Sequence, residues 1–330
     1  MTIPANQHLD HTTARHAGFE PTPGPIAVLP RENAVFAEAV RAGGGVVEPL
    51  SERTRGIVWL SYGDAEQITS TLDAHPGIEW VQLPWAGVDV FADVLRANAG
   101  RDRFVVTSAK GAYSEPVAEH AVALALATLR RMPEKSRAST WQETKTGISL
   151  YGLNVVLVGP GGIGTEIMRL LAPYRANVTV VRRSAEPVAG AVRTVTTAQL
   201  HEVLPGAHVV ILAAASTDDT RHLIGAPELA LLGPDSVLVN IARGPLVDQD
   251  ALVDALRSGA IGGAGLDVTD PEPLPADHPL WAEPACLITS HSADTPDMTR
   301  PLLANRITAN TRALLETGEF VGIVDREAGY

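Results

Sequence analysis

The sequence predicts an α/β protein with two doubly wound parallel-sheet domains, one inserted into the other. Its 330 residues are enough for about two domains. Two series of short apolar runs alternate with helical patterns along the chain. A long helical pattern separates the two series and another follows the second, so we expect the chain to leave the first domain and later return to it.

The first series occupies residues 26–113. Its apolar runs are at 26–29, 46–47, 57–60, 78–83 and 104–107, with a helical pattern at 32–41. Strands that alternate with helices favour βαβ units and a parallel sheet. The long helix is expected to begin at Ser114, before Glu115 and Pro116, because apolar residues recur at helical spacing from there to Leu129. We expect this helix to join the two domains.

The second series begins at Asn154 and predicts six strands. They are expected at 155–158, 178–181, 209–212, 237–241, 265–268 and 287–289. Six strands with helices between them are typical of a doubly wound nucleotide-binding sheet. A last helical pattern at 296–317 lies beyond this sheet. The predicted domains are therefore 26–113 together with 296–330, and 114–295.

The amino-terminal residues 1–25 mix Thr, His, Pro and Gly and lack the apolar core of a signal peptide. We expect a flexible tail there. His8, His11 and His16 could in principle bind a metal, but a polar tail is a poor site and no metal is expected. The nearest approach to a membrane span, at 121–129, is too short to cross a bilayer.

The composition disfavours several kinds of partner. The formal net charge is −12, whereas a nucleic acid or an anionic membrane needs a basic face on the protein. A small basic pocket for an anionic ligand is compatible with this charge. Cys286 is the only cysteine, so it cannot form an intramolecular disulfide, and we expect it to be a buried apolar residue. These features predict a soluble, cytoplasmic protein.

A glycine-rich loop lies between the first strand and the first helix of the second series. Gly159, Gly161 and Gly164 form the pattern G-x-G-x-x-G in this position. The first glycine allows a tight turn, the second lets the backbone approach a pyrophosphate, and the third lets helix and strand pack closely. The loop predicts a Rossmann domain that binds a dinucleotide, with Gly162 and Ile163 in the cofactor site. The alternative is a glycine-rich turn in an unrelated α/β domain.

The end of the next predicted strand bears on which dinucleotide is bound. An Asp or Glu about 20 residues after the loop usually binds the ribose 2′-hydroxyl of NAD. Arg182, Arg183 and Ser184 occupy that place, and arginine can bind a 2′-phosphate through paired charge-assisted hydrogen bonds. The sequence therefore favours NADP(H), with NAD(H) possible. In the alternative interpretation, both arginines are solvated surface charges and Glu186 serves the ribose.

Three segments of the second series are expected to meet where the strands end, because open α/β sheets bind ligands there. They are residues 240–248, 265–275 and 290–293, and they contain Arg243, Glu272 and His291. Taken singly, these residues could be a surface charge, a loop charge and a core histidine. Together they suit hydride transfer to a 2-oxoacid. The arginine would bind the carboxylate and carbonyl, the histidine would donate a proton, and the carboxylate would keep this histidine protonated.

With these residues in this order, the chain resembles the D-isomer-specific 2-hydroxyacid dehydrogenase family over nearly its whole length after the tail. The family includes phosphoglycerate, glycerate, glyoxylate/hydroxypyruvate, formate and D-lactate dehydrogenases. The resemblance implies that Arg243, Glu272 and His291 are catalytic. It also implies a flavodoxin-like substrate domain that receives the Rossmann domain as an insertion, an active site in the cleft, and a homodimer. The implied cofactor contacts include Ile241, Ala242 and Asp267, the last of these to the nicotinamide amide.

Other segments also carry the resemblance, among them residues 83–89, 118–120, 217–224 and 318–319. Residues 83–89, Leu-Pro-Trp-Ala-Gly-Val-Asp, look like the family loop whose backbone N–H groups hold the substrate carboxylate. This implies that Ala86 and Gly87 bind the substrate. Ala118-Glu119-His120 looks like the family's interdomain helix, in which the resemblance implies a structural role for His120.

The expected activity is reduction of a short 2-oxoacid to a 2-hydroxyacid by NADPH, because the arginines after the second strand resemble those of NADPH-using glyoxylate/hydroxypyruvate reductases. Two alternatives stay open. One is an NAD-dependent enzyme similar to phosphoglycerate dehydrogenase. The other is a nucleotide-sensing binding protein similar to the corepressors that share this fold. The sequence does not identify the 2-oxoacid.

Overall fold

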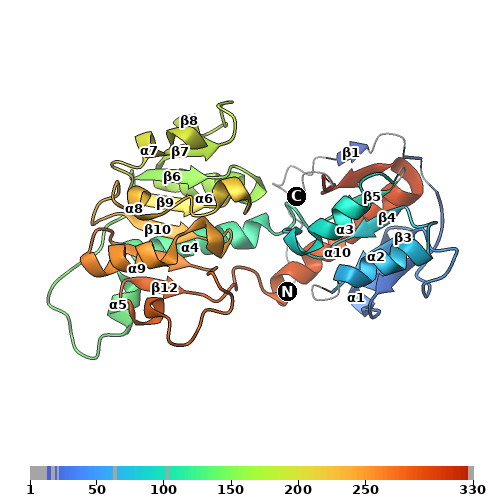
Figure 1. The fold of residues 1–330 in the computed structure, drawn as a ribbon, viewed down its shortest axis with the longest axis horizontal. Helices are drawn as coiled ribbons and strands as arrows, with labels where there is room; N and C mark the ends of the chain where they lie inside the picture. Colours follow the sequence, from blue (N-terminus) through green and yellow to red (C-terminus); the bar gives the residue numbers. More distant parts are fainter. Residues whose placement is uncertain (1–12, 16–18, 21, 62–64, 102–103, 326–330) are drawn as a thin grey trace. The chain divides into compact units, whose positions relative to one another are not determined.

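The structure is a computed structural model that describes residues 13–15, 19–20, 22–61, 65–101 and 104–325. The chain divides into two compact units (Figure 1). Unit 1 consists of Met1–Tyr113 and Thr295–Tyr330, and unit 2 consists of Ser114–Asp294. The chain therefore passes from one unit to the other at 113–114 and returns at 294–295.

Unit 1 is built on a four-stranded parallel sheet with the order β2-β3-β4-β5. The strands are β2 (Ile26–Leu29), β3 (Gly56–Trp59), β4 (Trp80–Gln82) and β5 (Val105–Thr107). Val47 forms a parallel bridge with Ile26, which pairs with Gly56 on its other side. Counting this bridge, the segments cross the sheet in the order second, first, third, fourth and fifth, which is the order of flavodoxin-like folds.

Helices cover this sheet and complete the core of unit 1. They are α1 (Ala34–Ala42), α2 (Ala65–Ala74), α3 (Ala92–Ala97) and α10 (Pro296–Arg312), with the short turns η1 (Asp89–Phe91) and η7 (Ala313–Thr317). The side chain of Asn33 caps α1 by accepting from the Val35 N–H. The helix expected at 296–317 is thus α-helical only to Arg312 and ends in a π-helical turn.

The described part of residues 1–25 differs from the flexible tail that the sequence predicts. β1 (Thr13–Arg15) pairs antiparallel with β13 (Glu319–Val321). Phe19 is 2% exposed and packs edge-on against Phe320, with ring centroids 5.0 Å apart. Burial of this ring and pairing along β13 provide contacts that order the segment. Residues 1–12, 16–18 and 21, with His8, His11 and His16 among them, lie outside the described residues.

A buried arginine ties the segment after β5 to α10. The Arg306 guanidinium donates to the carbonyl oxygens of Ser108 at 2.8 Å, Lys110 at 3.0 Å and Val321 at 3.4 Å. Burial lowers the pKa of Arg306 to about 10. Because backbone carbonyls solvate the charge, Arg306 can be buried while it fixes three segments of unit 1.

Unit 2 is built on a seven-stranded parallel sheet with the order β12-β11-β10-β9-β6-β7-β8. The strands are β6 (Asn154–Val158), β7 (Asn177–Arg182), β8 (Arg193–Thr196), β9 (Val209–Leu212), β10 (Val237–Asn240), β11 (Gly263–Leu266) and β12 (Cys286–Ile288). This is the Rossmann order 3-2-1-4-5-6 with β12 added beyond the sixth strand. β8 is not among the six strands that the sequence predicts, because it lies at the sheet edge and its residues Arg-Thr-Val-Thr contain only one apolar side chain.

Helices cover both faces of the unit 2 sheet. They are α4 (Ser114–Leu129), α5 (Met132–Ser136), α6 (Gly162–Leu171), α7 (Leu200–Val203), α8 (Ala226–Leu229) and α9 (Gln249–Ser258). Short turns complete the unit, namely η2 (Ala172–Tyr174), η3 (Thr197–Gln199), η4 (Asp218–Thr220), η5 (Gly244–Leu246) and η6 (Pro279–Ala282). α7, α8 and α9 share one apolar cluster with the sheet. α4 packs against α6 and against β10, β11 and β12.

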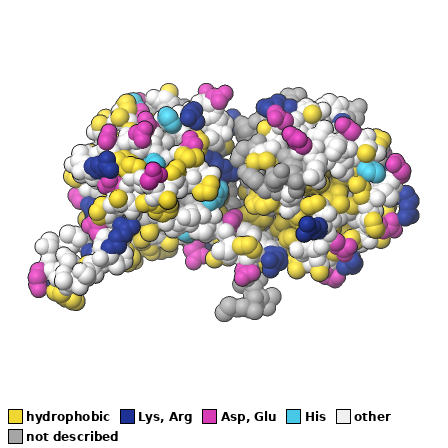
Figure 2. Space-filling model, turned by 60° about the horizontal axis from the view of Figure 1, so that its bottom comes forward, with side chains coloured by type: hydrophobic (Ala, Val, Ile, Leu, Met, Phe, Trp, Pro, Cys, Tyr) yellow, Lys and Arg dark blue, Asp and Glu magenta, His cyan; other side chains and the backbone are white. Residues whose placement is uncertain are grey.

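Two glycines let α4 lie close to β11. A Cβ on Gly265 would lie 3.0 Å from the Leu124 Cβ, and one on Gly263 would lie 2.7 Å from the Thr128 Cγ2. This close approach sets α4 directly over the strands whose ends carry the candidate site. Among the described residues, no helix is long and apolar enough to cross a membrane. Lys, Arg, Asp and Glu side chains are interspersed over the face drawn in Figure 2.

Candidate active site

The glycine-rich loop joins β6 to α6 as the sequence predicts. Gly159 has a φ of +96°, and a Cβ there would lie 2.7 Å from the Ala213 backbone. A Cβ on Gly164 would lie 2.2 Å from the Gly159 carbonyl oxygen, so this glycine lets the helix approach the loop. Gly161 precedes α6, and a Cβ there would meet nothing within 4 Å. The open space beside Gly161 and the N–H groups of the first turn, which includes Gly162 and Ile163, fit a pyrophosphate.

The side chains at the end of β7 only partly match the expected phosphate site. Arg182 ends the strand and is half-buried, and its Nη2 lies 3.7 Å from Oε2 of the exposed Glu186. Its Nη1 also donates to the Glu186 carbonyl oxygen at 3.5 Å. Arg183 is exposed, and Ser184 is half-buried. Glu186 therefore competes with a 2′-phosphate for Arg182, a contact that the sequence does not predict.

A histidine and a glutamate form a close pair beyond β11 and β12. Nδ1 of His291 lies 2.9 Å from Oε2 of Glu272. The hydrogen bond that His291 donates to Glu272 raises the pKa of His291, and partial burial opposes this only in part. Burial also disfavours the charged form of Glu272, but hydrogen bonds from His291 and Thr269 outweigh it and hold the pKa of Glu272 below its usual value. Since Nδ1–H donates to the carboxylate, Nε2 is left to donate a proton to a substrate.

The loop that carries Glu272 is fixed at several points. The Thr269 N–H donates to Glu272 Oε1 at 3.0 Å, and the Thr269 hydroxyl donates to the Pro271 carbonyl oxygen at 2.9 Å. The Asp270 N–H donates to Gln249 Oε1 on α9 at 3.1 Å. These bonds orient the Glu272 carboxylate without help from a ligand.

Arg243 lies next to this pair, at the end of β10. Asn240, 1% exposed, shapes the turn: its Oδ1 accepts from the Ala242 N–H, and its Nδ2 donates to the Arg243 carbonyl oxygen. Arg243 is half-buried, and its charge acts on both His291 and Glu272. A Cβ on Gly244 would lie 1.9 Å from the Thr269 carbonyl oxygen. The turn after Arg243 therefore contacts the loop of Glu272 backbone to backbone.

Asp267 is 1% exposed and holds the segment around His291. Its Oδ1 accepts from the Thr289 hydroxyl at 2.6 Å and from the Ser292 N–H at 2.8 Å, and its Oδ2 accepts from the Ala293 N–H at 3.2 Å. Burial disfavours ionisation of Asp267, but the nearby His120, with Nε2 3.4 Å from Oδ1, and the hydrogen bonds from Thr289 and Ser292 hold the pKa of Asp267 below its usual value. Asp267 thus anchors residues on both sides of His291.

The backbone at His291 is left-handed. Ser290 and His291 have φ values of 52° and 51°, in a region that costs a residue with a Cβ roughly 1–2 kcal/mol. The His291 N–H donates to the Asp267 carbonyl oxygen at 2.5 Å. Strain of this kind persists where surrounding contacts over-determine the conformation, and it is frequent at functional sites.

Comparison with known proteins identifies the family. Residues 122–293 match the model of the D-isomer specific 2-hydroxyacid dehydrogenase, NAD binding domain. The matched range contains the glycine-rich loop, Arg243, Glu272 and His291, and it spans just over half of the chain. The chain belongs to the D-isomer specific 2-hydroxyacid dehydrogenase family.

A relative and a solved structure are similar to this chain over most of its length. A glyoxylate/hydroxypyruvate reductase A of Klebsiella pneumoniae is 36% identical over 288 residues, which cover 86% of this chain and 85% of the relative. The crystal structure of a D-isomer specific 2-hydroxyacid dehydrogenase from Xanthobacter autotrophicus in complex with NADPH and MES is 28% identical. It has a TM-score of 0.76 and covers 94% of this chain and 100% of its own.

A second solved structure is similar over almost the same range. It is an NADPH-dependent glyoxylate/hydroxypyruvate reductase from Sinorhizobium meliloti in complex with citrate, 27% identical with a TM-score of 0.71, covering 92% of this chain and 98% of its own. The D-2-hydroxyacid dehydrogenase described here is therefore an oxidoreductase with a nicotinamide-cofactor domain.

The predicted substrate-binding residues of the dehydrogenase belong to unit 1. Ala86 and Gly87 are half-buried and follow β4. The loop is held from within unit 1: the Tyr113 hydroxyl donates to the Pro84 carbonyl oxygen at 2.6 Å, and the Ala109 N–H donates to the Trp85 carbonyl oxygen at 2.9 Å. The substrate-binding role of Ala86 and Gly87 stays a prediction.

Sequence reasoning missed several residues of the dehydrogenase site. Asp294 lies within electrostatic reach of His291, Arg243 and Asp267, and burial raises its pKa, with the Asp267 charge acting in the same direction. Thr289 and Asn240 are polar residues next to short strands, so no spacing pattern distinguishes them. Ile241 and Ala242 are buried, and the expected contacts of these two and Asp267 with a cofactor stay predictions.

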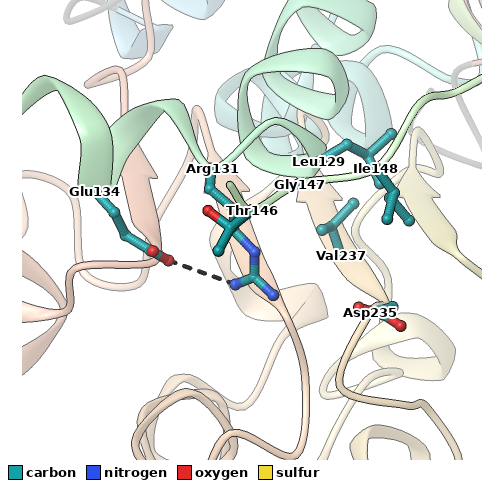
Figure 3. Close-up of a pocket in the computed structure, with 8 residues that line it drawn as sticks. All are labelled: Leu129, Arg131, Glu134, Thr146, Gly147, Ile148, Asp235 and Val237. Carbon is teal, nitrogen blue, oxygen red and sulfur yellow. Dashed lines mark hydrogen bonds and ion pairs between the residues drawn. The ribbon is translucent and has the colours of Figure 1, made fainter. Parts of the chain in front are cut away.

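A cavity of about 300 Å³ in unit 2 is lined by eight residues, Leu129, Arg131, Glu134, Thr146, Gly147, Ile148, Asp235 and Val237 (Figure 3). Arg131 and Glu134 form an ion pair of 3.4 Å at this cavity, and the cavity contains none of the predicted site residues.

Cys286 is buried as predicted, and burial raises the pKa of its thiol to about 12, which makes it inert at neutral pH.

Proposed function

We propose that this dehydrogenase reduces a short 2-oxoacid, such as glyoxylate or hydroxypyruvate, to the corresponding 2-hydroxyacid with NADPH. The observation that carries the proposal is the His291–Glu272 pair with Arg243 beside it, all at the carboxyl ends of strands. The relative from Klebsiella pneumoniae and the structure from Sinorhizobium meliloti, both named glyoxylate/hydroxypyruvate reductases, support this substrate class.

The reaction needs a hydride at C2 of the oxoacid and a proton at the carbonyl oxygen. When bound, the reduced nicotinamide supplies the hydride. His291 supplies the proton from Nε2, because its Nδ1–H is committed to Glu272. Arg243 binds the substrate carboxylate and polarises the carbonyl, and the backbone N–H groups of Ala86 and Gly87 hold the carboxylate. The product is a neutral hydroxyl beside a neutral imidazole.

The proposed preference for NADPH rests on Arg182, Arg183 and Ser184. A 2′-phosphate beside β7 would gain charge-assisted hydrogen bonds from these side chains. The structures from Xanthobacter autotrophicus and Sinorhizobium meliloti, the first in complex with NADPH and the second named NADPH-dependent, support this preference. One observation favours NAD(H) instead: Arg182 already pairs with Glu186, a carboxylate that could accept from a ribose hydroxyl.

Two further parts of the proposal concern the protein as a whole. A homodimer is proposed from the family resemblance, and a cytoplasmic location from the single cysteine of the sequence. Sedimentation of the purified protein tests the first of these, and fractionation of the source cells tests the second.

A substrate panel tests the proposed function. Purified enzyme is supplied with glyoxylate, hydroxypyruvate, pyruvate, phenylpyruvate or phosphohydroxypyruvate, and the loss of reduced-nicotinamide absorbance is followed with NADPH and with NADH. We expect the highest kcat/KM with glyoxylate or hydroxypyruvate and NADPH. A preference for phosphohydroxypyruvate and NADH would indicate an enzyme similar to phosphoglycerate dehydrogenase. Tight cofactor binding without reduction of any oxoacid would indicate the binding protein.

A further inference from the structure

His120 contacts the segment that carries His291, although the two residues are far apart in the sequence. His120 lies on the second turn of α4, and its Nε2 is 2.9 Å from the Thr289 hydroxyl oxygen and 3.4 Å from Asp267 Oδ1. Its side chain is 22% exposed, so the contact is largely protected from solvent. The contact joins α4 to Thr289, the residue that directly follows β12.

The directions of the hydrogen bonds that link His120, Thr289 and Asp267 follow from the number of protons that each side chain can donate. The buried Asp267 carboxylate is ionised and can only accept, so the Thr289 hydroxyl uses its single proton on Oδ1. The Thr289 oxygen must then accept from His120, which fixes a proton on Nε2 of His120. His120 therefore donates to Thr289, and Thr289 donates to Asp267.

This series of hydrogen bonds ends at the turn that carries His291, the proposed proton donor. Asp267 receives Thr289 on one side of His291, and the N–H groups of Ser292 and Ala293 on the other. Between these anchors, Ser290 and His291 adopt the left-handed conformation. A turn that is unfavourable for both residues needs anchors at both ends, and the carboxylate supplies them.

We propose that His120 is a positioning residue of the reduction, acting through Thr289 and Asp267 to hold the Ser290–His291 turn so that Nδ1 of His291 stays on Glu272. The inference rests on the proposed function for its kinetic consequences, but not for its geometry. Loss of the His120 donor loosens the Thr289–Asp267 anchor, and the distance between His291 and Glu272 becomes variable. The Nε2 proton of His291 is then displaced from the position needed for transfer, and the pKa of His291 is lowered.

The test compares His120→Ala with His120→Gln, whose side-chain amide can reproduce the Nε2–H donor. Glu119→Ala is the matched control, because Glu119 is the exposed neighbour on the same helix. Four quantities are measured for each variant: kcat, KM for the oxoacid, the dissociation constant of NADPH, and the melting temperature. The pH dependence of kcat/KM is recorded as well.

For His120→Ala we expect kcat to fall by ~10- to 100-fold, the scale of a catalytic group displaced by about an ångström. The dissociation constant of NADPH and the melting temperature should stay close to those of Glu119→Ala. The alkaline limb of kcat/KM should move to lower pH, because His291 then keeps less of the stabilisation from Glu272, while Arg243, Asp267 and Asp294 still act on it. His120→Gln should recover most of the loss.

A second pair of variants removes the dependence on one substitution. Thr289→Val deletes the hydroxyl that links His120 to Asp267, and Thr289→Ser retains it. The valine variant should reproduce His120→Ala, and the serine variant should resemble the wild type. If His120→Ala does not fold, this pair alone decides the question.

An NMR titration of the His291 imidazole separates this inference from the proposed function, since it requires no substrate. Its pKa should be lower in His120→Ala and in Thr289→Val than in the wild type, even if the enzyme reduces none of the oxoacids tested. An unchanged His291 titration and an unchanged kcat would overturn the inference. Loss of activity in step with the melting temperature, without recovery in His120→Gln, would also overturn it, because that result describes a purely structural contact.

Discussion

Glu272 Oε2 lies 2.9 Å from Nδ1 of His291, and this contact accounts for the elevated pKa of the histidine. Nδ1–H donates to the carboxylate, so Nε2 is the ring nitrogen left to act as the proton donor in the proposed reaction. Thr269 and the loop after β11 hold Glu272 in place. The His291–Glu272 pair and the residues that hold it therefore all lie in unit 2.

Glu272→Gln should move the alkaline limb of the reduction to lower pH. In the proposed reaction His291 must be protonated, and Glu272 raises the pKa of His291, so activity should be retained above the ordinary histidine pKa and lost as pH rises through the raised value. Without the carboxylate this loss begins earlier. The measurement is the pH profile of kcat/KM. Glu228→Gln, which alters a comparable pair with His201 elsewhere in unit 2, is the control and should leave the profile unchanged.

His291→Ala and Arg243→Ala should each lower kcat by at least ~100-fold, the usual contribution of a general acid or of a residue that stabilises developing charge. Neither substitution should change the dissociation constant of the cofactor appreciably, because neither residue belongs to the glycine-rich loop or to β7. Stopped-flow reduction with saturating NADPH measures the first effect, and cofactor titration the second. Near-normal turnover in His291→Ala would show that another group donates the proton.

Arg183→Ala should raise KM for NADPH by ~10-fold or more, since one charge-assisted hydrogen bond is worth about 1.5–3 kcal/mol and each decade of affinity about 1.4 kcal/mol. KM for NADH should change little, because NADH has no 2′-phosphate. Arg193→Ala removes an exposed arginine on neighbouring β8 that pairs with Glu202, and serves as the control. Equal effects of Arg183→Ala on both cofactors would restore the view that these arginines are ordinary surface charges.

Glu186→Ala distinguishes a site for the 2′-phosphate of NADPH from a site where Glu186 binds the ribose of NADH. If a 2′-phosphate binds here, release of Arg182 from its 3.7 Å ion pair should lower KM for NADPH. If Glu186 instead accepts from the ribose of NAD, the same substitution should raise KM for NADH. Initial rates with the two cofactors at one fixed oxoacid concentration decide between them, and added salt should weaken the NADPH preference in the first case.

Gly159→Ala should lower the stability of the protein, whereas Gly161→Ala should weaken cofactor binding. At Gly159, φ is +96° and a Cβ would collide with the Ala213 backbone, so alanine should lower the melting temperature of the apoprotein. At Gly161, φ is −68° and no atom lies within 4 Å of a Cβ, so alanine should leave the melting temperature nearly unchanged and weaken cofactor binding. Calorimetry and cofactor titration separate the two outcomes. A large loss of stability in Gly161→Ala would contradict this assignment of roles.

Much of the fold could be predicted because its signals are local. The glycine pattern after an apolar strand specifies β6, the loop and α6, and the apolar runs specify six of the seven strands of unit 2. β8 was missed because an edge strand buries too little apolar surface to leave a pattern. The pairing of β1 with β13 was missed because it joins opposite ends of the chain.

The candidate site was predictable in its charged residues and not in its supporting ones. Arg243, Glu272 and His291 carry chemistry that the sequence displays, and the structure places all three in unit 2. The link from His120 through Thr289 to Asp267 depends on a helix that passes over two short strands, which no spacing reveals. Competition of Glu186 for Arg182 likewise depends on how one exposed loop turns.

The contact of Gly244 with the Thr269 carbonyl limits how this enzyme can be re-engineered. The turn that carries Arg243 and the loop that carries Glu272 touch there without any side chain between them. A substitution at 244 would push the turn of Arg243 away from the loop of Glu272, and so away from the carboxylate that raises the pKa of His291. Mutant libraries meant to broaden the substrate range should therefore hold position 244 as glycine and place their diversity in unit 1, on the loop that contains Ala86 and Gly87.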